Sequence, residues 1–558
     1  MRHDPGAGAN PGRYLAALVV EELHRHGLGL VVACPGGRNQ PLLATLAARD
    51  DLDCRRVVDE RAAGHLALGW LRGQLAAGEP PRLAVVITTS GTAPLLLAPA
   101  LAEAHESGLP LVLVSADRPH ELHGVGANQT IDQVTPLAPL TRVRFTLPCH
   151  AGGAAPRDVL SAVAEAARVA HGPPAGPVQL NLQFREPLVP DPEPLPDRWT
   201  ADAAAWAERS APFATAPTVR CVPDEALVQL RDEVGTARRP LFWLANLATT
   251  ADRGAADALA RQSTAPWLAD AGSGVRLRPA SDRRLDQAGF YGDLLRDCDL
   301  VVQLGQRPVS LTTALALTGA RRWVVSDHPG RQDPRRQGGV HLRLGPAELR
   351  HALGDRPLLA RPDRDWIERL TAAQAEWNAR LVASIDRGDT LSEAWTVREV
   401  VRRLGPDHGL MLGNSLPVRH LDTLTCPDAP GPVVTTNRGT SGIEGQVAQA
   451  IGVSRGLGRP TVAILGDVTT QHDLGSLAIL ADEAPPLMIL VLQNSGGGIF
   501  RRLQASRHPQ LLDPWLTAHH PVDLCAVARA HGVFARRVRH RGGLANALTD
   551  FVRHPEST

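Results

Sequence analysis

Two apolar segments of this chain are followed by residues that could bind a metal ion. Residues 461–465 run into Asp467, and residues 487–492 are followed by Asn494 and Gly496. A carboxylate, a side-chain amide and a backbone carbonyl suit Mg²⁺, which keeps its other positions for water and phosphate. Glycines allow a diphosphate to approach the backbone closely. The alternative is that Asp467 and Asn494 are turn residues that hydrogen-bond their own backbone.

A second candidate for chemistry is Glu60, which lies at a predicted strand-to-helix junction. It follows Val57-Val58-Asp59 and precedes Arg61-Ala62-Ala63-Gly64. One interpretation is an exposed acid in the first helical turn, where the helix dipole favours negative charge. The other is a carboxyl group that shares a proton with a ligand nitrogen in an apolar pocket, which would raise its pKa. This segment alone leaves both interpretations open.

The composition is typical of a soluble globular protein, and the length indicates two to four domains. Of its residues, 43% are apolar and 21% are charged. A chain of 558 residues is too long to fold around one hydrophobic core. A net charge of +1 gives no general attraction to nucleic acid or to anionic membranes. No apolar stretch is long enough to span a bilayer, and the N-terminus lacks a signal-peptide core. We therefore expect a cytoplasmic enzyme without a nucleic-acid partner or a membrane span.

Two residue types narrow the chemistry further. The seven cysteines are scattered and form no CxxC pair, which favours reduced thiols over a disulfide framework or a zinc site. The chain contains no lysine. A Schiff base, a pyridoxal phosphate anchor and a Walker-type phosphate loop all require that amine, so these mechanisms are excluded.

Apolar strands spaced by helices predict parallel sheets that are covered on both faces. A helix is expected over 14–26, and a second one from the Ser90-Gly91-Thr92 cap to about Glu106. The predicted strands are 28–33, 82–88, 109–115, 240–244, 300–304, 322–326, 410–412, 433–435, 461–465 and 487–492. A proline-rich linker is expected over 187–196. The predicted fold class is α/β, with three domains, each a mostly parallel sheet whose carboxyl edge holds ligands.

These features together resemble the thiamine-diphosphate-dependent enzymes. The resemblance rests on Asp59 to Gly64, on the Asp467 to Asn494 spacing and on three α/β segments. It implies a pyrimidine-binding domain over 1–190, a central domain over 191–360 and a diphosphate and metal domain over 361–558. It also implies a homodimer or homotetramer, because the glutamate of one chain pairs with N1′ of a cofactor held by the partner chain. Glu60 would be that glutamate, and Asp467, Asn494 and Gly496 would hold Mg²⁺ or Mn²⁺.

A further ordered set of motifs narrows the resemblance. The set consists of Pro35-Gly36-Gly37-Arg38, Thr89 to Ala93, Ala116 to Leu122, Gly126 to Gln129, Gly413-Asn414-Ser415 with Arg419, and Asn437 to Gly445. With these motifs, the chain resembles the 2-succinyl-5-enolpyruvyl-6-hydroxy-3-cyclohexene-1-carboxylate synthases of menaquinone biosynthesis over nearly its whole length. That family decarboxylates 2-oxoglutarate and adds the succinyl unit to isochorismate.

The resemblance implies roles for the site residues. Four arginines would bind substrate carboxylates, since guanidinium binds carboxylate bidentately: Arg38, Arg118, Arg419 and Arg438. Three polar residues would lie near the reacting centre: Asn128, Gln129 and Ser415, of which Ser415 also touches the cofactor. Glu60, Gln129, Arg419 and Arg438 would be catalytic, and Ile443 would be an apolar wedge against the cofactor. The alternative for each arginine is a salt bridge at the surface or at a strand end.

Several positions depart from the family pattern. The family usually has a basic residue or pair where this chain has Leu311-Thr312, although Arg307 lies nearby. Gly37 stands where serine is usual, and Gln493 stands where the first asparagine of a pair is usual. The chain also ends where the family continues through another strand and helix. Two alternatives therefore remain: a thiamine-diphosphate-dependent 2-oxo acid decarboxylase or carboligase with another acceptor, and a non-catalytic homologue that binds cofactor or metabolite.

Overall fold

The computed structural model describes residues 10–149, 155–188, 191, 195, 197–217, 220–279, 283–424, 430–483 and 485–555. The chain forms two compact units. The first comprises Met1–Arg72 and Pro80–Thr218, and the second comprises Gly73–Glu79 and Val219–Thr558. The predicted linker over 187–196 falls partly outside the described residues.

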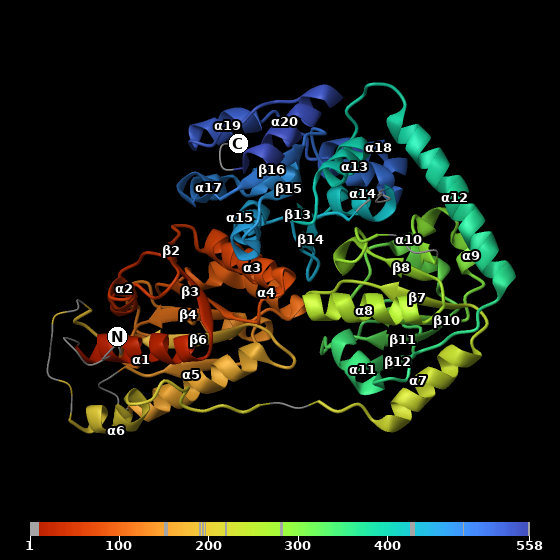
Figure 1. Ribbon diagram of the computed structural model, residues 1–558. Coiled ribbons are helices and arrows are strands. Elements are labelled where there is room, and N and C mark those ends of the chain that lie inside the picture. Colours follow the sequence, from red (N-terminus) through yellow and green to blue (C-terminus); the bar gives the residue numbers. More distant parts are fainter. Residues whose placement is uncertain are drawn as a thin grey trace. The chain divides into compact units, whose positions relative to one another are not determined.

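The first unit contains a parallel sheet of six strands in the order β2-β1-β3-β4-β6-β5. Figure 1 labels β2, β3, β4 and β6 of this sheet. The strands are β1 (Leu28–Ala33), β2 (Cys54–Arg56), β3 (Leu83–Thr88), β4 (Leu111–Asp117), β5 (Arg144–Leu147) and β6 (Val178–Gln183). β3 and β4 are buried along their whole length, as expected for central strands of a covered parallel sheet. The chain runs from β1 outward to β2 and then returns to β3, so the order switches between β1 and β3. Such a switch point leaves a crevice at the carboxyl ends of the strands.

Helices cover this first sheet. They are α1 (Pro11–Arg25), α2 (Gln40–Ala47), α3 (Glu60–Ala77), α4 (Ala98–Ser107) and α5 (Pro156–His171), and α1 packs against both α2 and α5. The predicted helix after Ser90 is interrupted, because a short 3₁₀ helix at Pro94–Leu97 precedes α4. Pro94 and Pro99 explain the interruption, since proline has no amide hydrogen and is tolerated only in the first helical turn.

The second unit contains two more parallel sheets. The six-stranded sheet has the order β12-β11-β10-β7-β8-β9, from β7 (Pro240–Leu244), β8 (Trp267–Ala269), β9 (Arg284–Leu285), β10 (Leu300–Leu304), β11 (Arg321–Val325) and β12 (Val340–Leu342). The four-stranded sheet has the order β14-β13-β15-β16, from β13 (Gly409–Leu412), β14 (Val433–Thr436), β15 (Thr461–Gly466) and β16 (Leu487–Leu492). Three parallel sheets covered by helices confirm the predicted α/β fold class.

Helices that matter for the candidate site surround the four-stranded sheet. They are α13 (Glu393–Arg403), α14 (Leu416–Leu424), α15 (Gln446–Leu457), α16 (Asp467–His472) and α20 (Arg541–Arg553). α13 packs against both α14 and α20 (Figure 1). Among the described helices, none is long and apolar enough to cross a membrane. The boundaries of the three predicted domains stay a prediction.

Candidate active site

The capping residue Asp59 fixes the position of Glu60. The Asp59 Oδ1 atom accepts hydrogen bonds from the backbone amides of Arg61, at 2.9 Å, and Ala62, at 3.3 Å. An acidic side chain that accepts from the second and third helical amides is an N-cap, so Glu60 is the first residue of α3. Burial, followed by the negative charges of Glu60 and Asp59, raises the pKa of the Cys34 thiol. Glu60 is half-buried at the predicted junction.

Two of the four candidate arginines lie together in the first unit. Arg38 follows β1 and Arg118 follows β4, so both lie at the carboxyl edge of the sheet. Arg118 is 8% exposed. Burial, followed by the positive charge of Arg38, lowers the pKa of Arg118. A bound anion would relieve the repulsion between these two guanidinium groups.

Hydrogen bonds orient both guanidinium groups. Arg118 Nη1 donates to the Ser90 hydroxyl and, at 2.8 Å, to the backbone oxygen of Gln129. Arg38 Nη1 donates to the backbone oxygen of Phe184 at 3.0 Å, and Nη2 lies 3.2 Å from the exposed Glu186 carboxylate. Within the described part of the chain, Arg118 Nε and Nη2 and Arg38 Nε have no hydrogen-bond partner. The two free nitrogens of Arg118 therefore remain for a bound carboxylate.

Gln129 packs against the turn that follows β3. Its Nε2 donates to the Ser90 backbone oxygen at 2.9 Å, and its φ of 55° is unusual for a residue other than glycine. Gly91 has a φ of 83°, and a Cβ there would lie 2.7 Å from Gln129 Cγ, so the turn requires glycine. Asn128 is exposed, and no hydrogen bond joins it to another predicted site residue among those described.

In the second unit, Asp467 and Gly496 lie together at the ends of two neighbouring strands. Asp467, the first residue of α16, is 1% exposed. Its Oδ1 accepts from the Val468 amide at 2.8 Å, and its Oδ2 accepts from the Gly496 amide at 3.0 Å. Gly496 has a φ of 140°, and a Cβ there would lie 2.1 Å from the Thr517 backbone oxygen. The backbone turn after β16 therefore needs glycine and holds the Asp467 carboxylate.

Asn494 joins this cluster from the same turn, and its Nδ2 donates to Glu393 Oε1 at 2.7 Å. The His520 side chain is 5% exposed, and its Nε2 lies 3.6 Å from Asp467 Oδ2. Among the described residues, no group of three His, Cys, Asp or Glu side chains could hold a metal. A divalent ion here would therefore depend on amide and backbone oxygens besides Asp467. Such a hard oxygen set fits Mg²⁺ or Mn²⁺.

The remaining predicted residues lie on two loops that hydrogen bonds connect. Asn414 Nδ2 donates to the Gly442 backbone oxygen at 2.7 Å, next to the half-buried Ile443. Arg438 Nη1 donates to Asn414 Oδ1 at 3.2 Å. Ser415 has a φ of 72°, and its backbone oxygen accepts from Arg419 Nη1 at 2.5 Å. The structure thus brings Arg438 and Ile443 to the turn that precedes α14, which carries Arg419.

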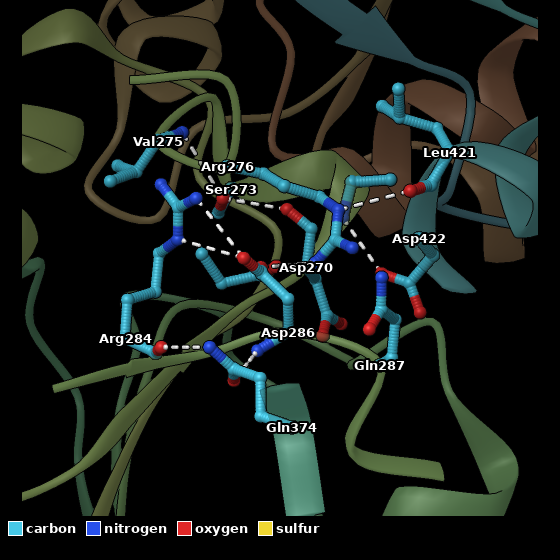
Figure 2. A network of polar contacts seen from close by, with 12 residues as sticks. Asp270, Ser273, Val275, Arg276, Arg284, Asp286, Gln287, Gln374, Leu421 and Asp422 are labelled. Atoms are coloured by element: carbon cyan, nitrogen blue, oxygen red, sulfur yellow. Dashed lines mark hydrogen bonds and ion pairs between the residues drawn. The ribbon is translucent and has the colours of Figure 1, made fainter. Parts of the chain in front are cut away.

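A buried polar network supports α14 (Figure 2). Arg276 Nε donates to the Leu421 backbone oxygen at 3.0 Å, and its Nη1 lies 3.4 Å from Asp286. Asp422 Oδ1 accepts from the Ala271 amide at 2.9 Å. These contacts anchor α14 to the loop after β8, at positions two and three residues beyond Arg419.

The same network holds a buried acid, Asp270. Its carboxylate accepts from Trp243 Nε1 at 2.6 Å and from the Val309 amide at 2.5 Å. Burial, followed by the negative charge of Asp422, raises the pKa of Asp270 to about 8. Burial also raises the pKa of Asp422. Like charges in a dry site disfavour one another, so the negative charge of Asp422 adds to the effect of burial on the pKa of Asp270.

The uncharged positions Leu311 and Thr312 begin α10 (Leu311–Ala316), where Leu311 is exposed. Arg307 Nη2, a few residues earlier, donates to the Gly439 backbone oxygen at 2.8 Å. Arg307 therefore contacts the loop that carries Arg438, and its positive charge lies beside that loop.

Comparison with known proteins agrees with this geometry. Residues 13–135 match the family described as "Thiamine pyrophosphate enzyme, N-terminal TPP binding domain". Residues 424–558 match "Thiamine pyrophosphate enzyme, C-terminal TPP binding domain". The fold and these two matches define the class of protein: a thiamine-pyrophosphate-dependent enzyme.

Relatives of almost the same length define the family. A protein of Rubrobacter xylanophilus is 37% identical over 551 residues, which cover 96% of this chain and 92% of the relative. Proteins of Chlorobaculum tepidum and Chlorobaculum parvum are 36% and 34% identical and cover 93% and 89% of this chain, and 88% and 84% of their own lengths. All three are named 2-succinyl-5-enolpyruvyl-6-hydroxy-3-cyclohexene-1-carboxylate synthase. The chain belongs to this synthase family.

The structure adds partners that the sequence patterns did not assign. Glu393 contacts Asn494 from 101 residues away, and Asp422 supports the helix of Arg419. Ser392 could have indicated only that a helix begins at Glu393, because serine is a common N-cap. No local signal connects that helix start to a distant asparagine.

Proposed function

We propose that this chain decarboxylates 2-oxoglutarate and adds the four-carbon unit to isochorismate, giving 2-succinyl-5-enolpyruvyl-6-hydroxy-3-cyclohexene-1-carboxylate. That product stands in the names of the relatives. The observation that carries the proposal is the pair Arg38 and Arg118, because two neighbouring cations with free donors suit a substrate with several carboxylates. Arg419 and Arg438, which the second unit carries, would bind further substrate carboxylates.

Thiamine diphosphate, when bound, supplies the carbanion chemistry. Glu60 would hold a proton at the cofactor nitrogen N1′, and its place at the start of α3 keeps it at one position. Asp467, the Asn494 amide oxygen and the Gly496 backbone oxygen would hold Mg²⁺ or Mn²⁺. Ser415 and Ile443 would contact the cofactor, while Asn128 and Gln129 would contact the substrate.

The proposal includes a cytoplasmic homodimer or homotetramer. In that assembly, Glu60 of one chain serves the cation site of a second copy. Mixing two inactive variants, Glu60→Gln and Asp467→Asn, tests this arrangement, because reassociated pairs would contain one site with neither substitution. Recovery of activity after dissociation and mixing supports a shared site, and no recovery of activity would contradict it.

One incubation tests the reaction itself. The protein is supplied with thiamine diphosphate, Mg²⁺ and 2-oxoglutarate, with and without isochorismate, and CO₂ and product mass are followed. We expect CO₂ release and the isochorismate adduct. CO₂ without that adduct would favour another acceptor, which the uncharged Leu311-Thr312 also favours. Absence of CO₂ from every 2-oxo acid would leave only a non-catalytic homologue.

A further inference from the structure

The Glu393 carboxylate connects two parts of the second unit that are far apart in sequence. Glu393 is the first residue of α13, which begins there because Ser392 Oγ accepts from the Trp395 amide at 3.2 Å. Glu393 Oε1 accepts from Asn494 Nδ2 at 2.7 Å. Its Oε2 lies 2.9 Å from His420 Nε2. One carboxylate therefore links the turn after β16 to α14.

The Glu393 carboxylate holds the Asn494 amide in one orientation. Its Oε1 accepts from Asn494 Nδ2 at 2.7 Å, and its Oε2 lies 2.9 Å from His420 Nε2. Each carboxylate oxygen is an acceptor, so the group that faces it is a donor. Asn494 must therefore direct its NH₂ group at Glu393, and His420 must carry its proton on Nε2. The flipped amide would place an oxygen against a carboxylate and is excluded electrostatically.

This orientation matters because only one end of the amide can bind a hard cation. Mg²⁺ and Mn²⁺ take the amide oxygen and not the NH₂ group. With Nδ2 held by Glu393, the Asn494 oxygen lies at the opposite end of the planar amide and remains available for the ion. In metal sites, residues that orient a ligand in this way commonly change metal affinity by 10- to 100-fold when they are replaced.

We infer that Glu393 is a positioning residue for the divalent-cation site, where it fixes Asn494 with its oxygen free for the ion. The inference rests on the proposed function, because Asn494 is itself a proposed ligand. His420 supports the same arrangement by holding the second carboxylate oxygen, and it directly follows Arg419 in α14. Glu393 thus connects the cation ligand to the helix that carries a proposed substrate arginine.

The test is the affinity of the full-length protein for Mn²⁺ with saturating thiamine diphosphate, from the electron paramagnetic resonance signal of free Mn²⁺. Glu393→Gln should weaken Mn²⁺ binding by about 10- to 100-fold. Glu399→Gln is the matched control on the same helix, because Glu399 pairs with Arg402 and Arg403 and not with the site. The control should bind Mn²⁺ as the unchanged protein does.

Two further readouts separate positioning from a general structural role. Asn494→Ala removes the ligand, so adding Glu393→Gln to it should cause no further loss of Mn²⁺ affinity. Turnover of Glu393→Gln should recover at high Mn²⁺, which would not occur for a misfolded site. Ser392 still caps α13 in this variant, and His420→Leu offers a second variant with a smaller loss in the same direction.

The outcomes distinguish the inference from the proposed function. Wild-type Mn²⁺ affinity in Glu393→Gln, or additive losses in the double variant, would overturn the role of Glu393 and leave the cation site intact. If the unchanged protein binds no Mn²⁺ with thiamine diphosphate, the proposed cation site fails, and the inference fails with it.

Discussion

Replacement of Arg118 by glutamine is the perturbation whose effect follows most directly from the structure. Arg118 is 8% exposed, and its Nε and Nη2 have no hydrogen-bond partner among the described residues. A hydrogen bond to a charged group contributes about 1.5–3 kcal/mol. At about 1.4 kcal/mol for each factor of ten, losing it lowers kcat/KM for 2-oxoglutarate by about 10- to 150-fold.

The neighbouring Arg38 strengthens this expectation. Repulsion between the two guanidinium groups raises the free energy of the unliganded protein, and a bound carboxylate would relieve it. Arg118→Gln removes the hydrogen bond to the substrate carboxylate and also removes the repulsion that substrate binding would relieve. We therefore expect the lower kcat/KM to come mainly from a higher KM.

The assay is CO₂ release across a range of 2-oxoglutarate concentrations. Arg185→Gln is a matched control in the same unit, because Arg185 is partly exposed and pairs only with Glu121 among the described residues. The control should keep wild-type kinetics. An Arg118→Gln variant that folds and keeps kcat/KM within about threefold of wild type would refute a substrate role, since a single such contact is worth more than that.

Two other predictions follow from contacts described above. Asp59→Ala removes the cap of α3, so the free energy of unfolding should fall by about 1 kcal/mol in urea titration and turnover should fall with it. Asp59→Asn, which also caps helices, should restore stability; equal stability of all three proteins would contradict the capping role. Asp270 has a folded pKa of about 8, above its unfolded value of about 3.9, so its contribution to stability is complete below the unfolded value and is lost as pH rises through about 8. The thermal unfolding temperature should therefore fall from pH 6 to 9, and less so in Asp270→Asn; parallel pH profiles would show that Asp270 does not titrate there.

The fold could largely be predicted because strand positions are encoded locally. Four predicted strands, 28–33, 240–244, 300–304 and 487–492, agree with β1, β7, β10 and β16. Runs of valine, isoleucine and leucine bounded by polar turns define such buried strands. The single helix predicted after Ser90 is wrong in its first part, because Pro94 and Pro99 divide it into a 3₁₀ helix and α4.

The sequence predicts those parts of the candidate site whose residues lie within a single turn. Asp59 and Glu60 are adjacent in sequence, so the capping pattern places the glutamate without knowledge of the rest of the fold. The Arg38–Arg118 pair depends on the strand order β1-β3-β4, and the Glu393–Asn494 contact depends on α13 packing beside the four-stranded sheet. The spacing of these residues along the chain predicts neither arrangement, because both arise from tertiary packing.

The most direct test of the central claim is the exchange of the cofactor C2 proton with deuterium, measured by proton NMR after acid quenching. The claim is that Glu60 makes this chain a thiamine-diphosphate-dependent enzyme. Glu60→Gln should still fold and bind thiamine diphosphate, but it should slow the exchange by at least about 100-fold, the lower range for acid–base catalysis by a positioned side chain. Equal exchange rates in the two proteins would contradict the claim.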